Sequence, residues 1–114
     1  MPSGNEEKIG SVQITVLDIT NLSSVTSATD GASINVKKFF SKTVFVNVSV
    51  NTNAVTVNIE ASHDGSTWFN LDSKTYTAAT GTDIFAYNSH FQYMRTTTTS
   101  QTDATVTTTI TARS

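Results

Sequence analysis

Cysteine is absent from this 114-residue sequence, and charged residues make up only 14% of it. Without cysteine no disulfide can form, and cysteine usage implies no compartment. The formal net charge at pH 7 is −2. A domain that binds nucleic acid normally has a basic face, so we expect no nucleic-acid partner.

Long apolar runs and helical periodicity are also missing. No run approaches the roughly 18 apolar residues that cross a bilayer, so we expect no membrane-spanning segment. The N-terminal stretch MPSGNEEKIG is polar and acidic, the reverse of a secretory signal peptide. Leucine is scarce, and no segment has apolar residues at the i, i+3, i+4, i+7 spacing of an amphipathic helix.

Threonine and valine are abundant instead, with 22 and 11 copies. Both are β-branched and favour strands over helices. Apolar and polar residues alternate in short segments about 8–12 residues apart, which is typical of a sandwich or barrel. We therefore predict an all-β protein, an antiparallel β-sandwich that is jelly-roll-like and has about eight strands. Residues 11–114 form this single domain, and residues 1–10 form a flexible N-terminal arm.

The alternation also places the individual strands. It is clearest from Lys42 to Val50, where one face has Val44, Val46, Val48 and Val50 and the other has Phe45, Asn47 and Ser49. Residues 18–31 are rich in Ser, Thr, Asn and Asp, and we expect a long loop there. The remaining strands are expected at residues 9–17, 32–36, 55–62, 66–71, 75–79, 82–87, 91–99 and 104–112.

Residues 55–71 predict a β-hairpin with Asp64 and Gly65 in its turn, because glycine accepts a positive φ without steric cost. A two-residue turn would pair Ala61 with Trp68. That register would place the only tryptophan of the chain on the apolar face of the hairpin.

A three-residue turn with a glycine bulge shifts this pairing by one residue. Phe69 then lies opposite Ile59 on the apolar face, and Trp68 lies opposite Glu60 on the other face. We favour the bulged register because it gathers the apolar side chains. Trp68 is then either covered by another part of the chain or available to a partner.

Candidate catalytic and metal-binding residues are few. His63 and His90 are the two histidines, and neither has a second histidine or paired carboxylates at metal-ligand spacing. Asp64, Asp72 and Asp83 lie at turns, where aspartate caps its own backbone; calcium bound by several loops stays an open alternative. Nucleophile elbows and phosphate-binding loops are missing. We expect no catalytic residues, no metal, no cofactor and no enzymatic activity.

Two segments are candidate contact surfaces. Lys37, Lys38 and Lys42 place three positive charges around Phe39 and Phe40, which indicates either a loop anchored in the core by a ring or a patch for an acidic partner. The closing strand has threonine at every second position. This threonine ladder indicates either a solvent-facing sheet or a flat surface for subunit or ligand contact, and it comprises Thr105, Thr107, Thr109 and Thr111.

The chain from Val57 to Ala112 resembles a group of small phage virion proteins. Their pattern is an alternating strand, then S-x-D-G-x-x-W-x-x-L, a glycine turn, an aromatic strand and a closing Thr/Val strand. The residues that match are Ser62, Asp64, Gly65, Trp68, Leu71, Gly81, Phe85, Tyr87, Phe91, Tyr93, Arg95 and Thr105–Thr111.

The resemblance implies a single-domain sandwich that decorates or cements a capsid, often as a trimer. We therefore expect a non-enzymatic virion protein on the capsid surface, made in the host cytoplasm. Its expected partners are the major capsid protein and further copies of itself. The expected contact residues are Glu6, Glu7, Lys8 and Ile9 in the arm, with Lys37, Lys38 and Trp68 in the domain.

The alternative function is that of a carbohydrate-binding β-sandwich module on a head or tail fibre. Trp68 or Tyr87 would then be the platform on which a sugar stacks. The D-G-x-x-W element also occurs in discoidin-type carbohydrate-binding modules. This chain departs from those modules because it is shorter and has no cysteine pair.

Overall fold

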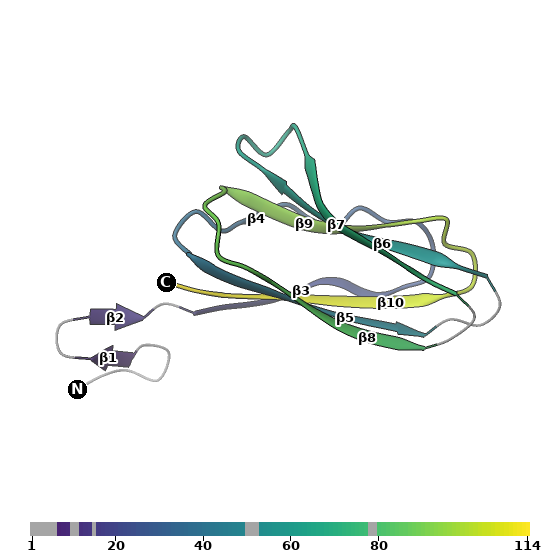
Figure 1. Cartoon of the computed structure of the whole chain (residues 1–114), viewed down its shortest axis with the longest axis horizontal. Helices are drawn as coiled ribbons and strands as arrows, with labels where there is room; N and C mark the ends of the chain where they lie inside the picture. Colours follow the sequence, from purple (N-terminus) through teal and green to yellow (C-terminus); the bar gives the residue numbers. More distant parts are fainter. Residues whose placement is uncertain (1–6, 10–11, 15, 50–52, 78–79) are drawn as a thin grey trace.

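The computed structural model describes residues 7–9, 12–14, 16–49, 53–77 and 80–114. These residues contain strands and no helix (Figure 1). In chain order the strands are β1 (Glu7–Ile9), β2 (Val12–Ile14), β3 (Val16–Val25), β4 (Ile34–Asn35), β5 (Ser41–Ser49), β6 (Val55–Ser62), β7 (Phe69–Tyr76), β8 (Gly81–Tyr87), β9 (Tyr93–Thr99) and β10 (Thr105–Arg113).

Strands β3 to β10 form two four-stranded antiparallel sheets, which confirms the predicted β-sandwich (Figure 1). The strand orders are β3-β10-β5-β8 in the first sheet and β4-β9-β6-β7 in the second. Consecutive strands alternate between the sheets except in the β6–β7 hairpin. This is the double-sheet arrangement of a jelly roll. Strands β1 and β2 form a separate hairpin, which lies outside the two-sheet body in Figure 1.

Valine and isoleucine at alternate positions of the central strands build the core. On β5, Val44, Val46 and Val48 are buried, whereas Phe45 and Asn47 between them are exposed. Strands β6 and β10 show the same alternation. Each fully buried aliphatic side chain of this size contributes roughly 1.5–3 kcal/mol. The face predicted for Val44, Val46 and Val48 is therefore confirmed, and Val50 lies outside the described residues.

The loop predicted over residues 18–31 is wrong, because β3 spans Val16–Val25 and pairs with β10. On this edge strand only Leu22 is buried, and the other positions are exposed or half-buried. An edge strand that faces solvent can contain Ser, Thr and Asp at most positions. The alternation of apolar and polar residues that marks a strand is therefore not visible in this segment. The polar Asn21 is used inside the protein, as described below.

The N-terminal segment also differs from the single strand predicted at residues 9–17. The chain forms β1 and β2 first and begins β3 at Val16. Of the predicted arm, residues 1–6 and 10 lie outside the described residues, and Glu7–Ile9 form β1. A flexible arm at residues 1–10 stays a prediction.

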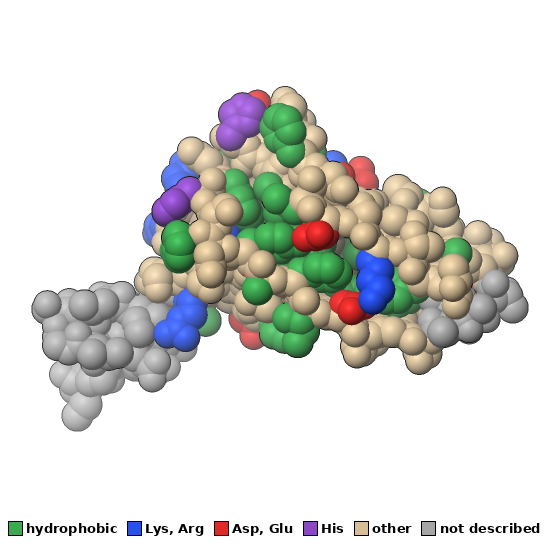
Figure 2. Space-filling view, viewed as in Figure 1, with side chains coloured by type: hydrophobic (Ala, Val, Ile, Leu, Met, Phe, Trp, Pro, Cys, Tyr) green, Lys and Arg blue, Asp and Glu red, His purple; other side chains and the backbone are tan. Residues whose placement is uncertain are grey.

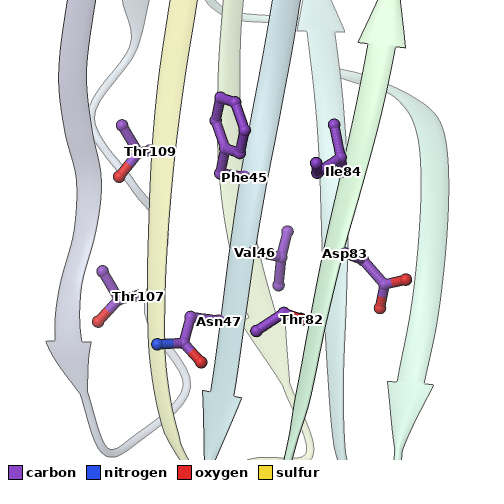
Figure 3. Close-up of a pocket in the computed structure, with 8 residues that line it drawn as sticks. All are labelled: Phe45, Val46, Asn47, Thr82, Asp83, Ile84, Thr107 and Thr109. Atoms are coloured by element: carbon purple, nitrogen blue, oxygen red, sulfur yellow. The ribbon is translucent and has the colours of Figure 1, made fainter.

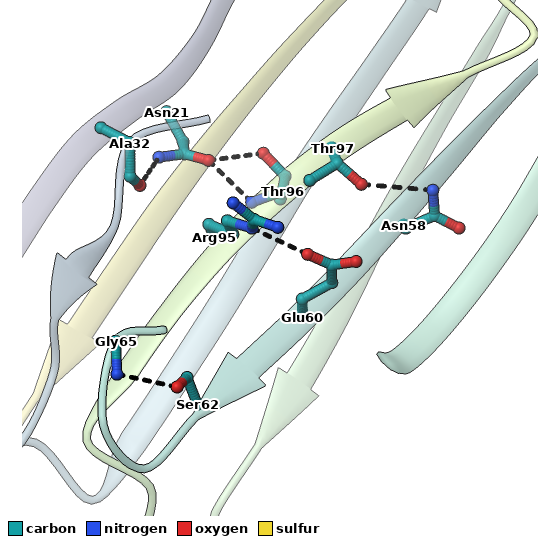
Figure 4. Close-up of polar contacts among 9 residues, drawn as sticks. All are labelled: Asn21, Ala32, Asn58, Glu60, Ser62, Gly65, Arg95, Thr96 and Thr97. Carbon is teal, nitrogen blue, oxygen red and sulfur yellow. Dashed lines mark hydrogen bonds and ion pairs between the residues drawn. The ribbon is translucent and has the colours of Figure 1, made fainter. Parts of the chain in front are cut away.

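Hydrogen bonds through the core join the two sheets near β3. The Leu22 amide donates to Thr108 Oγ1 at 3.1 Å, and the hydroxyls of Thr108 and Thr96 lie 2.6 Å apart. Thr96 Oγ1 and its amide both donate to Asn21 Oδ1 at 2.7 Å (Figure 4). Thr96 therefore accepts from Thr108, and each hydroxyl donates once and accepts once. The buried threonines satisfy one another across the sandwich.

Gly31 makes this network possible. The side chain of Asn21 also donates to the Ala32 carbonyl at 2.9 Å, and the Gly31 amide donates to the Thr96 carbonyl at 2.8 Å. A β-carbon on Gly31 would lie 2.1 Å from Asn21 Oδ1 and 2.7 Å from the Thr96 carbonyl oxygen. Glycine is required here by close approach of the chain to its neighbours.

Two tyrosine–aspartate pairs join the sheets at the opposite edge, where β7 faces β8. Tyr76 of β7 donates to Asp83 of β8 at 2.6 Å, and Tyr87 of β8 donates to Asp72 of β7. Lys74 of β7 lies 2.9 Å from the Asp83 carboxylate. Burial and the Asp83 hydrogen bond raise the pKa of Tyr76, and the Tyr76 hydrogen bond followed by that of Lys74 lowers the pKa of Asp83.

We expect Gly31→Ala to lower the free energy of unfolding by about 2–4 kcal/mol, because the clash displaces Asn21 and leaves buried polar atoms unpaired. Urea denaturation followed by tryptophan fluorescence measures the change. Ser33→Ala is the control, since Ser33 is exposed in the same connection, and its effect should stay within about 0.5 kcal/mol. Equal stability of both variants would contradict the importance of this network.

Candidate functional site

The β6–β7 hairpin has a longer turn than either predicted register. Ala61 pairs with Phe69, so residues 63–68 connect the strands. A β-bulge at Leu71 shifts the pairing again farther along the hairpin. Both predicted pairings of Trp68 are therefore wrong. Phe69, which was expected on the apolar face, is 58% exposed.

Ser62 and Asp64 hold this longer turn through backbone amides. Asp64 Oδ1 accepts from the amides of Ser66 and Thr67 at 2.8 Å, and Ser62 Oγ accepts from the Gly65 amide at 2.8 Å. Gly65 has a φ of 80°. The amide hydrogen bonds from Thr67 and then Ser66 lower the pKa of Asp64 to about 2. Asp64 is therefore a turn cap, as the sequence indicates.

Trp68 is covered by Arg95 of β9. The guanidinium carbon lies 4.3 Å from the ring centroid, and Arg95 Nε donates to Glu60 Oε1 at 2.8 Å (Figure 4). Glu60 and Arg95 are paired residues on the outer face, so Trp68 lies on the face opposite the buried Ile59. The predicted orientation is thus observed, although the register that led to it is wrong. A half-buried ring already stacked by a cation is a poor platform for a sugar.

Three loops meet at one end of the sandwich, which we call the loop end. They comprise residues 36–40 between β4 and β5, residues 63–68 between β6 and β7, and residues 88–92 between β8 and β9. The Val36 amide donates to the Gln92 carbonyl at 2.8 Å, and the Gln92 amide donates to the Ser62 carbonyl at 3.2 Å. These bonds make one continuous surface from three segments that are distant in sequence.

Lys42 joins two of these loops from inside. Its side chain is fully buried, and its ammonium donates to the carbonyl oxygens of Phe39 at 3.2 Å, Phe40 at 3.0 Å and Ser89. The ammonium also lies 4.3 Å from the ring centroid of Phe91. Burial lowers the pKa of Lys42. The sequence pattern groups Lys42 with Lys37 and Lys38, but Lys42 is in phase with the buried valines of β5, and that alternation is the signal that it faces the core.

The outer side of the loop end presents Lys37, Lys38 and Phe40. Phe39 is 8% exposed and anchors its loop in the core, which agrees with the anchored-loop interpretation. Phe40, by contrast, is 48% exposed. Lys37 and Lys38 are also exposed, and neither has an ion-pair partner within the described residues. The loop therefore combines a fixed backbone with charged and apolar groups that face solvent.

The two histidines lie beside exposed phenylalanines rather than in a catalytic set. The ring centroids of His90 and Phe40 are 5.3 Å apart, and those of His63 and Phe69 are 6.0 Å apart. Figure 2 shows both histidines in purple toward the same end, each beside a hydrophobic side chain. Across the described ranges, no three His, Cys, Asp or Glu side chains gather where they could hold a metal ion.

A groove of about 600 Å³ lies on the outer face of the first sheet (Figure 3). Thr109, Phe45 and Ile84 form one cross-strand row over β10, β5 and β8. Phe45 is 42% exposed and Ile84 is 66% exposed. The next row is polar and uncharged, with Thr107, Asn47 and Thr82. We call these two rows the sheet face, and Thr107 and Thr109 are the part of the threonine ladder that belongs to it.

The outer face of the second sheet is different, because its polar side chains bind one another. Asn58 donates to Thr97 Oγ1 at 3.2 Å (Figure 4). It also accepts from Ser73 Oγ at 2.7 Å. Thr56 and Thr75 hydroxyls lie 2.8 Å apart. This face has its hydrogen bonds satisfied internally, whereas the sheet face exposes apolar surface at its centre.

The predicted contact residues divide into two groups. One group belongs to the loop end and consists of Lys37, Lys38 and Trp68. The other belongs to the N-terminal segment, where Glu7, Lys8 and Ile9 form β1 and Glu6 lies outside the described residues. In the part of the chain that the structure describes, no helix has the length and apolar character needed to cross a membrane.

Comparison with known proteins identifies the fold. No protein-family model matches this chain, and no curated protein matches it by sequence. The SPBc2 prophage-derived protein YomS is similar in structure, with a TM-score of 0.61 and 15% identity over 94% of this chain and 100% of that chain. A protein of Bacillus endospore appendages, described as disulfide-linked pili, has a TM-score of 0.50 and 16% identity over 88% of this chain and 82% of that chain.

A CBM4 structure has a TM-score of 0.45 and 18% identity over 95% of this chain and 71% of that chain. At such low identities the likeness concerns the all-β fold alone. The structural neighbours thus include a prophage-derived protein and a spore appendage, and this chain shares its sandwich architecture with them.

We expect the Asp64 carboxyl to titrate near pH 2, because its carboxylate accepts two amide hydrogen bonds in the folded protein. The stability that the Asp64 carboxylate contributes is then fully present above its ordinary pKa of 3.8 and is lost as the pH falls toward 2. Carbon-detected NMR of the side-chain carboxyls measures the midpoint, and Asp64→Asn assigns the resonance. A midpoint near 3.8 would show that the turn does not hold the carboxylate.

Proposed function

We propose that this chain is a non-enzymatic structural protein of a phage virion. In this role it is a decoration or cement subunit that binds the major capsid protein on the capsid surface and bridges neighbouring copies. The observation that carries the proposal is the distribution of exposed apolar side chains. Large hydrophobic residues that gather on a surface mark contact sites for other proteins.

Five large hydrophobic residues are exposed among the described residues, and they occupy two places. Phe45 and Ile84 are on the sheet face. The other three are at the loop end or beside it, and they are Phe40, Phe69 and Val16. Val16 is the first residue of β3 and pairs with Arg113 at the end of β10. Two separate contact surfaces are what a bridging subunit needs, since one holds the shell and the other holds a neighbour.

The phage assignment is supported by the likeness to YomS, which extends over the whole of that prophage-derived protein. A phage protein of this kind is made in the host cytoplasm and joins the particle during assembly. Many identical weak contacts on a symmetric shell add up, because each bound copy raises the effective concentration of the next contact. High affinity of a single site is then unnecessary.

The β1–β2 hairpin supports bridging as well. It forms a separate two-stranded sheet outside the sandwich body (Figure 1). An isolated two-stranded hairpin is only marginally stable in water, so packing against a neighbouring subunit would stabilise it. We propose that this segment reaches an adjacent subunit, and that the sheet face joins copies of the chain into a homo-oligomer, a trimer by analogy with virion proteins of this type.

Purified protein should bind to particles of a phage mutant from which the gene for this chain has been deleted. Removing residues 1–14 should reduce occupancy at least several-fold without lowering the melting temperature of the sandwich, because the hairpin is outside the core. Sedimentation of particles followed by quantitative mass spectrometry measures occupancy. Unchanged occupancy of the truncated chain would remove the hairpin from the mechanism, and failure of the full chain to bind would contradict the decoration function.

A second candidate function is carbohydrate binding, and the groove on the sheet face favours it. Its volume of about 600 Å³ is in the range of small-molecule sites. Phe45 offers an exposed ring, and Asn47 and Thr82 offer hydrogen-bonding groups beside it. The platforms expected from sequence are engaged elsewhere, because Trp68 stacks on Arg95 and the Tyr87 hydroxyl donates to Asp72.

The double variant Phe45→Ser/Ile84→Ser separates these two uses of the sheet face. We expect the wild type to self-associate at micromolar concentration and the variant to be monomeric by light scattering, because the variant loses the apolar centre of the interface. Trp68→Ala should leave self-association unchanged. Binding to a glycan array that depends on Phe45 and not on Trp68, with a monomeric wild type, would favour the carbohydrate-binding function instead.

A further inference from the structure

We propose that the loop end is the surface that docks on the shell, and that its partner is an acidic protein surface with an apolar pocket. Lys37 and Lys38 supply the charge, and Phe40 supplies the apolar anchor. This inference rests on the proposed decoration function and names the attachment surface within it.

The loop end carries more positive than negative charge, because Lys37 and Lys38 are exposed there and Asp64 is the only acidic residue of its three loops. Lys74 and Arg95 each pair with a carboxylate, at 2.9 and 2.8 Å. Lys37 and Lys38 have no such partner among the described residues, so their full charge is available to another molecule. At the opposite end, the described residues of the β5–β6, β7–β8 and β9–β10 connections contain Asp103, and Lys, Arg and His do not occur among them.

This difference in charge between the two ends of the sandwich orients the subunit on its partner. An acidic surface attracts the loop end and repels the opposite end, and the attraction acts before contact over about a Debye length, 8–10 Å at physiological ionic strength. Nucleic acid is a weaker fit, because neutralising a phosphate backbone takes a basic stripe and this chain has a net charge of −2.

The backbone behind the lysines is already fixed. The buried Lys42 ammonium holds the carbonyls of Phe39, Phe40 and Ser89 together, and the Val36 amide donates to the Gln92 carbonyl. A loop that is held in place before binding loses little conformational entropy when it docks. Without these hydrogen bonds, the segment around Lys37 would become ordered only on binding the partner, at a cost in conformational entropy.

Phe40 adds an apolar anchor to this charged rim. It is 48% exposed, and the His90 ring at 5.3 Å limits the directions in which its side chain can turn. Aromatic anchors surrounded by polar groups are the usual centre of protein interfaces. Lys37 and Lys38 together with the Phe40 ring therefore fit a partner surface that has acidic side chains around an apolar pocket.

The test compares binding to particles that lack this chain. We expect Lys37→Gln/Lys38→Gln to weaken binding on the order of tenfold at low salt and to reduce the dependence of binding on salt. Phe40→Ser should weaken binding with the salt dependence retained. Thr77→Glu/Thr80→Glu is the control, because it changes net charge by the same −2 at exposed positions of the opposite end, and it should bind like the wild type.

Carbodiimide cross-linking gives a second readout that needs no variant. It joins lysine amines to carboxylates in contact, so Lys37 or Lys38 should be linked to Asp or Glu of the shell protein. Equal binding of Lys37→Gln/Lys38→Gln and the wild type, or shell cross-links that involve Lys74 and neither loop lysine, would overturn the inference while leaving the decoration function intact. A wild type that binds no particles would refute the decoration function itself.

Discussion

A chain of hydrogen bonds through the core joins the two sheets, from the Leu22 amide through Thr108 and Thr96 to Asn21. Every hydroxyl in it has both a donor and an acceptor, and each strengthens the next in a low-dielectric interior. A buried polar group that loses its partner costs about 1–3 kcal/mol. Purely apolar sheets could slide over one another, whereas this network allows one alignment.

The fixed alignment has consequences at both edges and at the surface. Near β3 the network requires Gly31, and at the β7–β8 edge Tyr76 and Tyr87 bind aspartates across the sheets. With both edges joined, the loop end and the sheet face keep constant geometry. Exposed side chains such as Phe40 and Phe45 are then presented on a rigid body, which suits a subunit that adds many identical contacts to a shell.

Sequence reasoning succeeded where burial alone decides the pattern and failed where distant polar contacts decide it. The alternation of β5, β6 and β10 predicted the faces of their side chains. Strand β3 was missed because Asn21 looks like a loop residue until Thr96 is placed beside it. The hairpin register was missed because Ser62 and Asp64 stabilise a six-residue turn through backbone amides. The alternation of β5 predicts that Phe45 faces outward. That Phe45 lies beside Ile84 depends on the order of the strands in the sheet, which a single sequence does not reveal.

A cryo-electron microscopy reconstruction of the phage particle tests the central claim most directly. The account predicts density for a jelly roll on the outer surface of the capsid, with Lys37 and Lys38 at the end that contacts the shell. It also predicts that the Phe45 and Ile84 face of one copy meets another copy. Particles without this density, or a jelly roll attached by the opposite end with both lysines in solvent, would contradict the account.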